Sequence, residues 1–251
     1  MSLSPRERLT LDIQRAVSRC LFVFFGPMMV ILFHFRFKYK FQDIDKIREE
    51  YKRHLNSCQG PLIICSNHLT LIDSIIQSLG LNSILGHLRR YSGLPWNLPE
   101  KNNFYHNTKW KIICYLGKCI PVVRMASASD GKKSMNKMLY VLNKGDVLSI
   151  FPEGKRSRSG KIDDVDFSYG AGQLIKDIPH ANVLCIYLRG KKQGGFANFP
   201  SRGEEFYFKM DLINPYSQES GLRKARDLSR QIIEKLKIME QEYFNDIAIC
   251  R

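Results

Sequence analysis

The sequence lacks most of the short patterns that identify a particular kind of site. Its seven cysteines form no C-x-x-C pair, which argues against a zinc or dithiol site of that kind. It has no G-x-x-x-x-G-K-[ST], no H-E-x-x-H and no G-x-S-x-G, so it lacks the signatures of P-loop NTPases, zincin proteases and nucleophile-elbow hydrolases. Gly170-Ala171-Gly172 lacks the third glycine of a dinucleotide-binding loop and is weak evidence for one.

The odd number of cysteines, in a chain of 251 residues, also argues against a disulfide scaffold. Several cysteines lie within apolar runs, such as Ile63-Ile64-Cys65 and Val183-Leu184-Cys185-Ile186. We expect them to be small buried hydrophobic residues in a reducing compartment, and we expect no metal site.

The composition is that of an ordinary globular protein, with 44% hydrophobic and 25% charged residues. Collagen-like, coiled-coil and wholly disordered chains are excluded, and the sequence has no internal repeat and no low-complexity stretch. The formal net charge is +15, which predicts an anionic partner. This partner could be nucleic acid, an anionic bilayer or a phosphorylated substrate, because the net charge alone does not distinguish them.

An apolar run covers residues 20–35 and has basic residues at both ends. No small-x-small cleavage site follows it, so it is not a cleavable signal. The run is shorter than the roughly 20 residues that a spanning helix needs, and Gly26-Pro27 interrupts it. We expect a helical hairpin at a membrane interface, with a hairpin buried against the domain as the alternative. The predicted division is a membrane-associating segment over 1–45 and a catalytic domain over 46–251.

Strand and helix patterns alternate along the rest of the chain, which predicts an α/β fold with a mixed sheet flanked by helices. Aromatic residues alternate with polar ones over 33–42, as in an amphipathic strand whose basic face meets either solvent or lipid phosphates. Further strands are expected over 61–65, 147–151, 183–188 and 205–212, and helices over 44–57, 69–79, 134–143 and 222–244. Gly145, after Lys144, is expected to end the helix over 134–143.

His68 and Asp73 follow the apolar strand over 61–65 and could form a base and its orienting carboxylate. On a continuous helix, five residues at roughly 100° each would place the two side chains about 140° apart. They can meet only if His68 lies in the loop before a helix and Asp73 lies in its first turns. Taken alone, such a pair is more often structural than catalytic.

A second polar cluster, Phe151 to Gly160, follows the strand over 147–151. It contains three cations, and its glycines allow backbone N–H groups to approach a phosphate. The simpler interpretation is a solvated basic loop. We expect Glu153 to order this loop through an ion pair with the neighbouring cations.

Together, N-H-x-x-x-x-D and F-P-E-G-x-R-S about 80 residues later resemble the glycerolipid acyltransferase family, which contains the lysophosphatidic acid acyltransferases. The resemblance covers roughly residues 60–215. It implies that His68 is the general base, oriented by Asp73, and deprotonates a glycerol hydroxyl that attacks the thioester carbonyl of an acyl donor. It requires no metal and no cofactor, with acyl-CoA or acyl carrier protein thioester as co-substrate.

The resemblance also implies an acceptor-binding site. The F-P-E-G-x-R-S block maps to Glu153, Gly154 and Arg156, and we expect Lys155 and Ser157 of the same loop to contribute. A middle block, Gly117 to Arg124, places Arg124 at the acceptor phosphate. We also expect backbone N–H groups at a helix start near His68 to stabilise the oxyanion.

Three departures from the family pattern leave the acyl donor open. The Gly117-to-Arg124 spacing is one residue longer than usual, Lys155 stands where many members have Thr, and Cys185-Ile186-Tyr187-Leu188 has no proline. The middle block and Phe-Pro-Glu-Gly-Lys are similar to the tafazzin branch, which moves acyl chains between phospholipids without a thioester. Arg156-Ser157 resembles the thioester-using branch.

The resemblance implies a membrane-associated acyltransferase of the 1-acylglycerol-3-phosphate type in phospholipid synthesis or remodelling. Its partners would be a phospholipid membrane, a lysophospholipid acceptor and an acyl donor, with no nucleic acid, and its active site would face the reducing, cytoplasmic side. The first alternative is a CoA-independent transacylase. Others are a hydrolase using His68 with Ser66 or another serine, a catalytically silent lipid-binding relative, and a basic nucleic-acid-binding domain.

Overall fold

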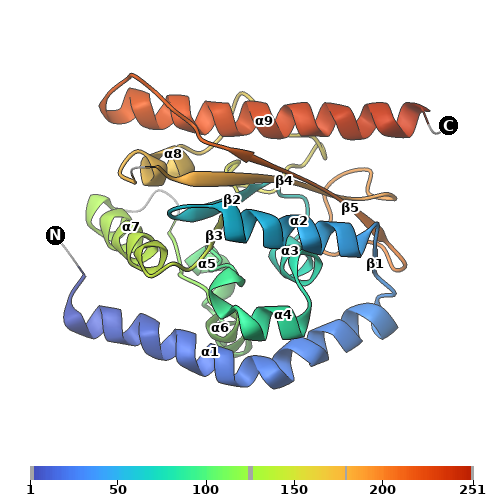
Figure 1. Cartoon of the computed structure of the whole chain (residues 1–251), viewed down its shortest axis with the longest axis horizontal. Helices are drawn as coiled ribbons and strands as arrows, with labels where there is room; N and C mark the ends of the chain where they lie inside the picture. The colour runs from blue at the N-terminus through green and yellow to red at the C-terminus, as the bar shows by residue number, and fades with distance from the viewer. Residues whose placement is uncertain (1–2, 124–126, 179, 250–251) are drawn as a thin grey trace.

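The structure is a computed structural model that describes residues 3–123, 127–178 and 180–249. A five-stranded mixed sheet forms its centre, in the order β1-β5-β4-β2-β3 (Figure 1). The strands are β1 (Lys40–Phe41), β2 (Leu62–Ser66), β3 (Leu148–Ile150), β4 (Asn182–Gly190) and β5 (Glu205–Ile213). β2 is parallel to both β3 and β4, β1 is parallel to β5, and only β4 and β5 are antiparallel. The predicted α/β class with a mixed sheet is confirmed.

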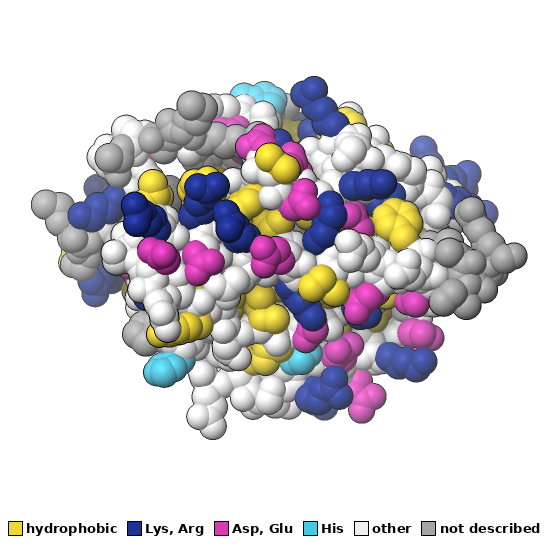
Figure 2. All heavy atoms as spheres, turned by 90° about the horizontal axis from the view of Figure 1, so that it is seen from above, with side chains coloured by type: hydrophobic (Ala, Val, Ile, Leu, Met, Phe, Trp, Pro, Cys, Tyr) yellow, Lys and Arg dark blue, Asp and Glu magenta, His cyan; other side chains and the backbone are white. Residues whose placement is uncertain are grey.

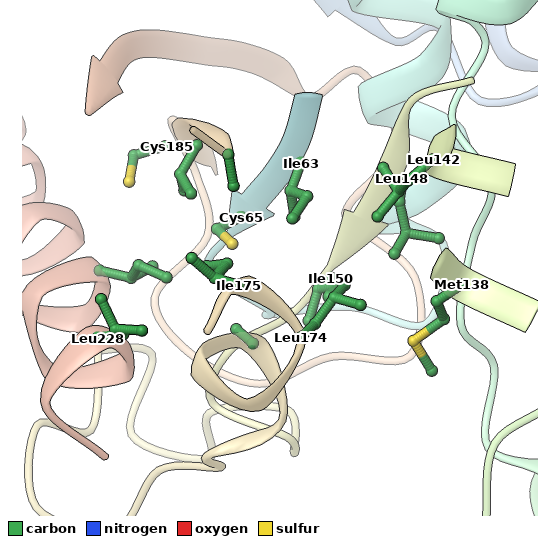
Figure 3. Close-up of a cluster of buried hydrophobic side chains, with 14 of the residues drawn as sticks. Ile63, Cys65, Met138, Leu142, Leu148, Ile150, Leu174, Ile175, Cys185 and Leu228 are labelled. Atoms are coloured by element: carbon green, nitrogen blue, oxygen red, sulfur yellow. The ribbon is translucent and has the colours of Figure 1, made fainter. Parts of the chain in front are cut away.

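Helices cover both faces of this sheet, as the uninterrupted burial of β2 and β4 requires. One face packs against α7 (Ala128–Asn143), α8 (Gly170–Ile175) and α9 (Gly221–Ile249). Figure 3 shows this core, where Ile63, Cys65 and Ile150 meet Leu174 of α8. The other face packs against α2 (Ile44–Ser57) and α3 (Asp73–Leu81).

The contact between α8 and α9 depends on a glycine. A Cβ atom at Gly172 would lie 1.9 Å from the carbonyl oxygen of Ala225, so no larger side chain fits. The Gly172 N–H donates to the Ser229 hydroxyl at 3.0 Å. The outer face of α9 carries intermixed basic and acidic side chains (Figure 2), with ion pairs such as Lys209–Glu242 at 2.7 Å. This is a solvated face and not a continuous positive patch.

The lower layer in Figure 1 consists of α1 (Pro5–Ile31) and a group of shorter helices. These are η1 (Leu32–Arg36), α4 (Ile84–Arg89), η2 (Tyr91–Gly93), α5 (Lys101–Phe104) and α6 (Thr108–Leu116). The predicted helical hairpin is wrong, because α1 continues through Pro27 as one bent helix. Proline removes one helix hydrogen bond and bends the axis, while the remaining bonds keep the helix intact. Pro5–Arg36 is also long and apolar enough to cross a membrane by length and composition, contrary to the length argument made for residues 20–35.

Polar contacts hold α1 along the domain. The Gln14 amide donates to the carbonyl oxygens of Tyr115 and Cys119, at 3.2 and 3.1 Å. Arg15 pairs with the buried carboxylate of Asp146 at 2.9 Å. Asp146 also accepts a hydrogen bond from the Trp96 indole at 2.8 Å. The buried Lys118 ammonium lies 3.7 Å from the same carboxylate and donates to the carbonyl oxygen of Leu94 at 2.7 Å.

The outer side of α1 is apolar, whereas a helix at the surface of a water-soluble protein usually has its polar side outward. Its inward-facing positions include the polar residues Gln14 and Ser18, as well as Gly26. Its exposed hydrophobic side chains are Leu9, Ile13, Val17, Leu21, Val23, Phe24, Met28, Val30 and Ile31. Leu85 of α4 and Ile112 of α6 are exposed as well. We refer to these residues of α1, α4 and α6 as the apolar face.

The strand predicted over 33–42 is mostly wrong. Residues 32–36 form the π-helical turn η1, and only Lys40 and Phe41 pair as a strand. In a helical turn Phe33 and Phe37 lie on one side, and their ring centroids are 5.9 Å apart. Phe35 is 69% exposed, so the alternation of buried and exposed residues breaks there.

Candidate active site

The two polar loops predicted to carry chemistry lie side by side because they leave neighbouring parallel strands. β2 leads to the loop of His68, and β3 leads to the loop of Glu153. The His68 N–H donates to Oε1 of Glu153 at 3.0 Å, and the Ser157 N–H donates to the His68 carbonyl oxygen at 2.8 Å. Loops at the carboxyl ends of parallel strands are the usual position of a ligand site in an open α/β sheet.

His68 and Asp73 are in contact, in the one geometry that their spacing permits. His68 lies in the loop after β2, Asp73 is the first residue of α3, and His68 Nδ1 lies 3.0 Å from Asp73 Oδ2. The same carboxylate accepts the N–H groups of Leu69 and Thr70 at 2.6 and 2.7 Å, and the Thr70 hydroxyl bonds to its other oxygen. These donors hold an ionised carboxylate against Nδ1, which fixes that ring nitrogen as the N–H donor.

The other ring nitrogen of His68, Nε2, forms no hydrogen bond within residues 3–123, 127–178 and 180–249. The His68 side chain is 19% exposed, so a substrate can reach it. The imidazole stacks on Phe151, with ring centroids 4.0 Å apart and an interplanar angle of 14°. This stacking fixes the plane of the ring, and it could not be foreseen because 83 positions of sequence separate the two residues.

Buried amides anchor the His68 loop to the sheet. Asn67 donates to the carbonyl oxygen of Leu188 at 2.9 Å and accepts the N–H of Leu188 at 2.8 Å, so it pairs as a strand residue would. Gln77 of α3 bonds to the Ser66 hydroxyl and donates to Ser149 of β3 at 3.1 Å. Ser66 is therefore buried against α3 and not directed at His68, which removes it as the nucleophile of the hydrolase alternative.

Glu153 is buried and forms no ion pair with a described residue, so the expected pairing with its cationic neighbours is wrong. Its side chain points inward to the His68 backbone, whereas Lys155 pairs with Asp163 at 3.1 Å and with Asp166. Burial raises the pKa of the Glu153 carboxyl to about 7, and the N–H groups of His68 and Asp163 only partly offset this. The second oxygen, Oε2, is buried and has no hydrogen-bond partner among the described residues.

The other residues of this loop that were predicted to bind substrate, Gly154, Lys155 and Ser157, lie in different environments. Gly154 has φ +68°, and a Cβ atom there would lie 2.8 Å from Ser168 Cβ, so the turn requires glycine. Ser157 is buried, and its hydroxyl bonds to the Lys161 carbonyl oxygen. Because its carboxylate partners neutralise Lys155, this lysine is a weaker candidate for binding a phosphate than the sequence indicated.

Arg156 of this loop forms no ion pair with a carboxylate among the described residues. It donates to Asn198 Oδ1 at 2.9 Å, and its guanidinium carbon lies 4.6 Å from the ring centroid of Phe196. The main-chain carbonyl oxygen of Asn198 accepts the N–H of Leu71 at 3.0 Å, so the loop between β4 and β5 covers the His68 loop. Arg124, the other predicted phosphate ligand, lies outside the described residues.

An apolar cavity opens between α1 and the start of α3. Ser74 and Ile75, which follow Asp73, form one wall, and Phe22, Phe25 and Met29 of α1 form another. Among the described residues there is no group of three or more His, Cys, Asp or Glu that could hold a metal ion. The six described cysteines are free, and Cys65, Cys114 and Cys185 are buried.

Comparisons with known proteins agree with this arrangement. A protein from Dictyostelium discoideum named Taffazin is 30% identical over 158 residues, which is 60% of this chain and 52% of the relative. The chain therefore spans about half the length of that curated relative. The family model described as Acyltransferase matches residues 38–188, which include both polar loops and more than half of the chain. The chain therefore belongs to the Acyltransferase family.

Proposed function

We propose that this protein transfers a fatty acyl chain to the free hydroxyl of a lysophospholipid, such as 1-acyl-glycerol-3-phosphate, at a membrane surface. The contact between His68 and Asp73 carries the proposal. With Nδ1 held as a donor to the carboxylate at 3.0 Å, Nε2 presents its lone pair to the accessible side of the ring. This is the arrangement that removal of a proton from an alcohol requires.

In the proposed reaction, His68 Nε2 takes the proton of the acceptor hydroxyl as its oxygen attacks the acyl carbonyl carbon. The Asp73 carboxylate stabilises the imidazolium that forms. The carbonyl electron pair moves onto oxygen and returns as the bond to the leaving group breaks. His68 then gives its proton to that leaving group, a thiolate for a thioester donor, and returns to its neutral state.

The acceptor phosphate would bind Arg156, together with Arg124. A guanidinium can hold two phosphate oxygens at once, which orients the acceptor as well as binding it. Because the Arg156 loop bonds directly to the His68 backbone through Ser157, a phosphate bound there would place the glycerol hydroxyl within reach of His68.

The apolar face and the apolar cavity suit a lipid substrate. An in-plane α1 would place its exposed hydrophobic side chains in the bilayer interface, while Arg15 and Gln14 remain bonded to the domain. The cavity between α1 and α3 has a volume of only about 60 Å³, so it would take a few methylene groups of an acyl chain beside Asp73 and leave the rest of the chain to the bilayer. The catalytic loops would then face the reducing, cytoplasmic side, as the free cysteines suggest.

Two acyl donors are consistent with the residues, and one observation favours each. Arg156-Ser157 favours a thioester of CoA or acyl carrier protein, and the match to Taffazin favours a phospholipid donor. The outer α9 surface gives no support to a nucleic-acid-binding role, since it mixes both signs of charge.

The deciding experiment offers labelled lysophosphatidic acid to detergent-solubilised protein with acyl-CoA, acyl carrier protein thioester or diacyl phospholipid as sole donor. His68→Ala is tested in parallel. We expect labelled diacyl product that decreases by about 10²- to 10⁴-fold in the variant. Product from phospholipid alone would identify a transacylase. Equal turnover by the wild type and the folded variant would contradict the proposed role of His68.

A further inference from the structure

Ion pairs that join α1 to α7 leave one lysine without a partner. Lys133 pairs with Glu7 at 3.3 Å, and Lys144 pairs with Asp12 at 2.7 Å. Lys137 lies on the same side of α7, between these two pairs, and no carboxylate or hydrogen-bond acceptor in the described part of the chain bonds to it. Instead it faces a cavity.

This cavity has a volume of about 420 Å³ and lies between α1, α6 and α7. Lys111 of α6 lines it as well, and the ammonium group of this lysine forms no ion pair or hydrogen bond with a described residue. Tyr105 and Tyr115 also line the cavity. None of the lining residues belongs to the His68 or Glu153 loops, so the cavity is separate from the candidate active site.

The cavity is cationic. Three lysines line it, and Glu7, which is already paired with Lys133, is its single acidic residue among the described positions. Burial and the nearby Lys133 ammonium lower the pKa of Lys137, and the Glu7 carboxylate offsets this only in part. An anion bound between Lys111 and Lys137 would supply the hydrogen-bonding partner that both ammonium groups lack among the described residues.

The cavity also opens beside the apolar face. Thr10, Leu11 and Gln14 of α1 line it, whereas the adjacent positions Leu9 and Ile13 are exposed on the outer side of the same helix. Ile112, the neighbour of Lys111, is 55% exposed. A largely apolar cavity that carries lysine ammonium groups and is bordered by exposed aliphatic side chains matches the headgroup and acyl chains of a phospholipid.

We propose that the α1–α6–α7 cavity is a second binding site for a phosphate group, held between Lys111 and Lys137, and that it takes the headgroup of an anionic phospholipid or free phosphate. Occupancy would link Lys111 of α6 to Lys137 of α7, which no carboxylate among the described residues does by an ion pair. The proposal does not depend on the reaction carried out at His68.

The test uses the full chain in detergent and measures the rate of acetylation of each lysine by mass spectrometry. The probes are inorganic phosphate, dihexanoyl phosphatidic acid and the uncharged dihexanoylglycerol, with sodium chloride at equal ionic strength as the reference. We expect the two phosphate-bearing probes to slow labelling of Lys111 and Lys137 at least fivefold, while Lys132, exposed on α7, is unaffected. Protection by phosphatidic acid at a lower concentration than inorganic phosphate assigns the site to a lipid headgroup, and the reverse order assigns it to free phosphate.

Two single variants test whether the lysines act together. In Lys111→Gln the labelling of Lys137 is measured, and in Lys137→Gln the labelling of Lys111 is measured. In each variant the probe concentration that gives half-maximal protection should rise at least tenfold. Lys132→Gln is the matched control and should leave it unchanged. Equal labelling with and without phosphate, or equal protection by dihexanoylglycerol or sodium chloride, would overturn the proposal. Circular dichroism of each variant confirms that the fold is retained.

Discussion

The backbone N–H of His68 donates a hydrogen bond to Oε1 of Glu153 at 3.0 Å, which joins the two polar loops through a buried carboxyl group. We therefore expect Glu153 to act on the candidate base through the main chain of His68. The F-P-E-G pattern of this chain would then have a positional function, because this hydrogen bond helps to fix the backbone that carries the His68 ring.

Two substitutions of Glu153 distinguish the effect of its hydrogen bond from the effect of its charge. We expect Glu153→Ala to lower kcat roughly 10- to 100-fold with little change in KM, because a displaced base loses rate far more than binding. Glu153→Gln keeps an acceptor oxygen and should recover most of the rate. Steady-state kinetics on both variants measure this, and equal losses in the two would mean that the charge matters more than the hydrogen bond.

The buried Glu153 carboxyl should also make stability depend on pH. Its pKa is about 7 in the folded protein against an ordinary value of 4.5, so the unfolded chain loses this proton first as the pH rises. Stability from this group is fully present below about pH 4.5 and falls as the pH rises to about 7, by on the order of 3 kcal/mol. Glu153→Gln cannot ionise and should lack this fall. Tm measured for both proteins at pH 5 and pH 8 checks it, and parallel changes would contradict the prediction.

Asp73→Asn tests the orientation of the His68 ring. The variant keeps the size of the side chain, but an amide can turn its N–H₂ toward Nδ1 and reverse the tautomer, so Nε2 would carry the proton. We expect kcat to fall about 10³-fold or more with near-normal acceptor affinity. Calorimetric titration with acceptor and a turnover assay measure the two quantities separately. A variant with normal turnover would contradict the role of Asp73 in orienting His68.

The apolar face should bind membranes without contributing to the stability of the domain. Phe24 is 75% exposed and Val17 is 36% exposed, so Val17→Glu/Phe24→Glu should weaken binding to phospholipid vesicles severalfold and leave Tm within a few degrees. Val165→Glu, at an 89% exposed position outside α1, is the control for added charge. Leu11 is only 5% exposed, and Leu11→Glu should instead unfold the N-terminal contact. Vesicle co-sedimentation measures membrane binding, and thermal unfolding measures Tm. Unchanged co-sedimentation of the double variant would contradict the position of α1 in the membrane interface.

Asp146 should be essential for the attachment of α1. Its carboxylate lies 2.9 Å from Arg15 Nε and 3.7 Å from the fully buried Lys118 ammonium, whose pKa burial lowers to about 7. Asp146→Ala would leave Lys118 buried without an anion, at a cost of about 3 kcal/mol or more. Chemical denaturation should show this loss, and proteolysis should cut within α1 first. Loss of stability without faster cleavage in α1 would contradict the prediction, because it would show that Asp146 compensates the buried charge of Lys118 but does not hold α1 on the domain.

Local sequence patterns determined much of the fold. The helix over 44–57 and the strands at 61–65, 183–188 and 205–212 lie within a residue or two of the predicted positions. The helix has one apolar face at the helical period, whereas β2 and β4 are continuous apolar runs that are buried on both faces. Gly145 ends α7 with φ +79°, as predicted. Along α9, the helix predicted over 222–244, apolar residues at helical spacing are buried from Ala225 to Tyr243, whereas Leu222 in the first turn is exposed.

The sequence by itself determined which residues are candidates for the chemistry, since His68, Asp73 and the F-P-E-G block can be recognised from residue type and spacing alone. Only the tertiary structure decided what they contact. The inward direction of Glu153, the stacking of Phe151 on His68 and the neutralisation of Lys155 by two aspartates follow from parallel pairing of β2 with β3 and from the path of the loop after it. The continuity of α1 through Pro27 was likewise decided by contacts with α4, α6 and α7, which local propensity does not encode.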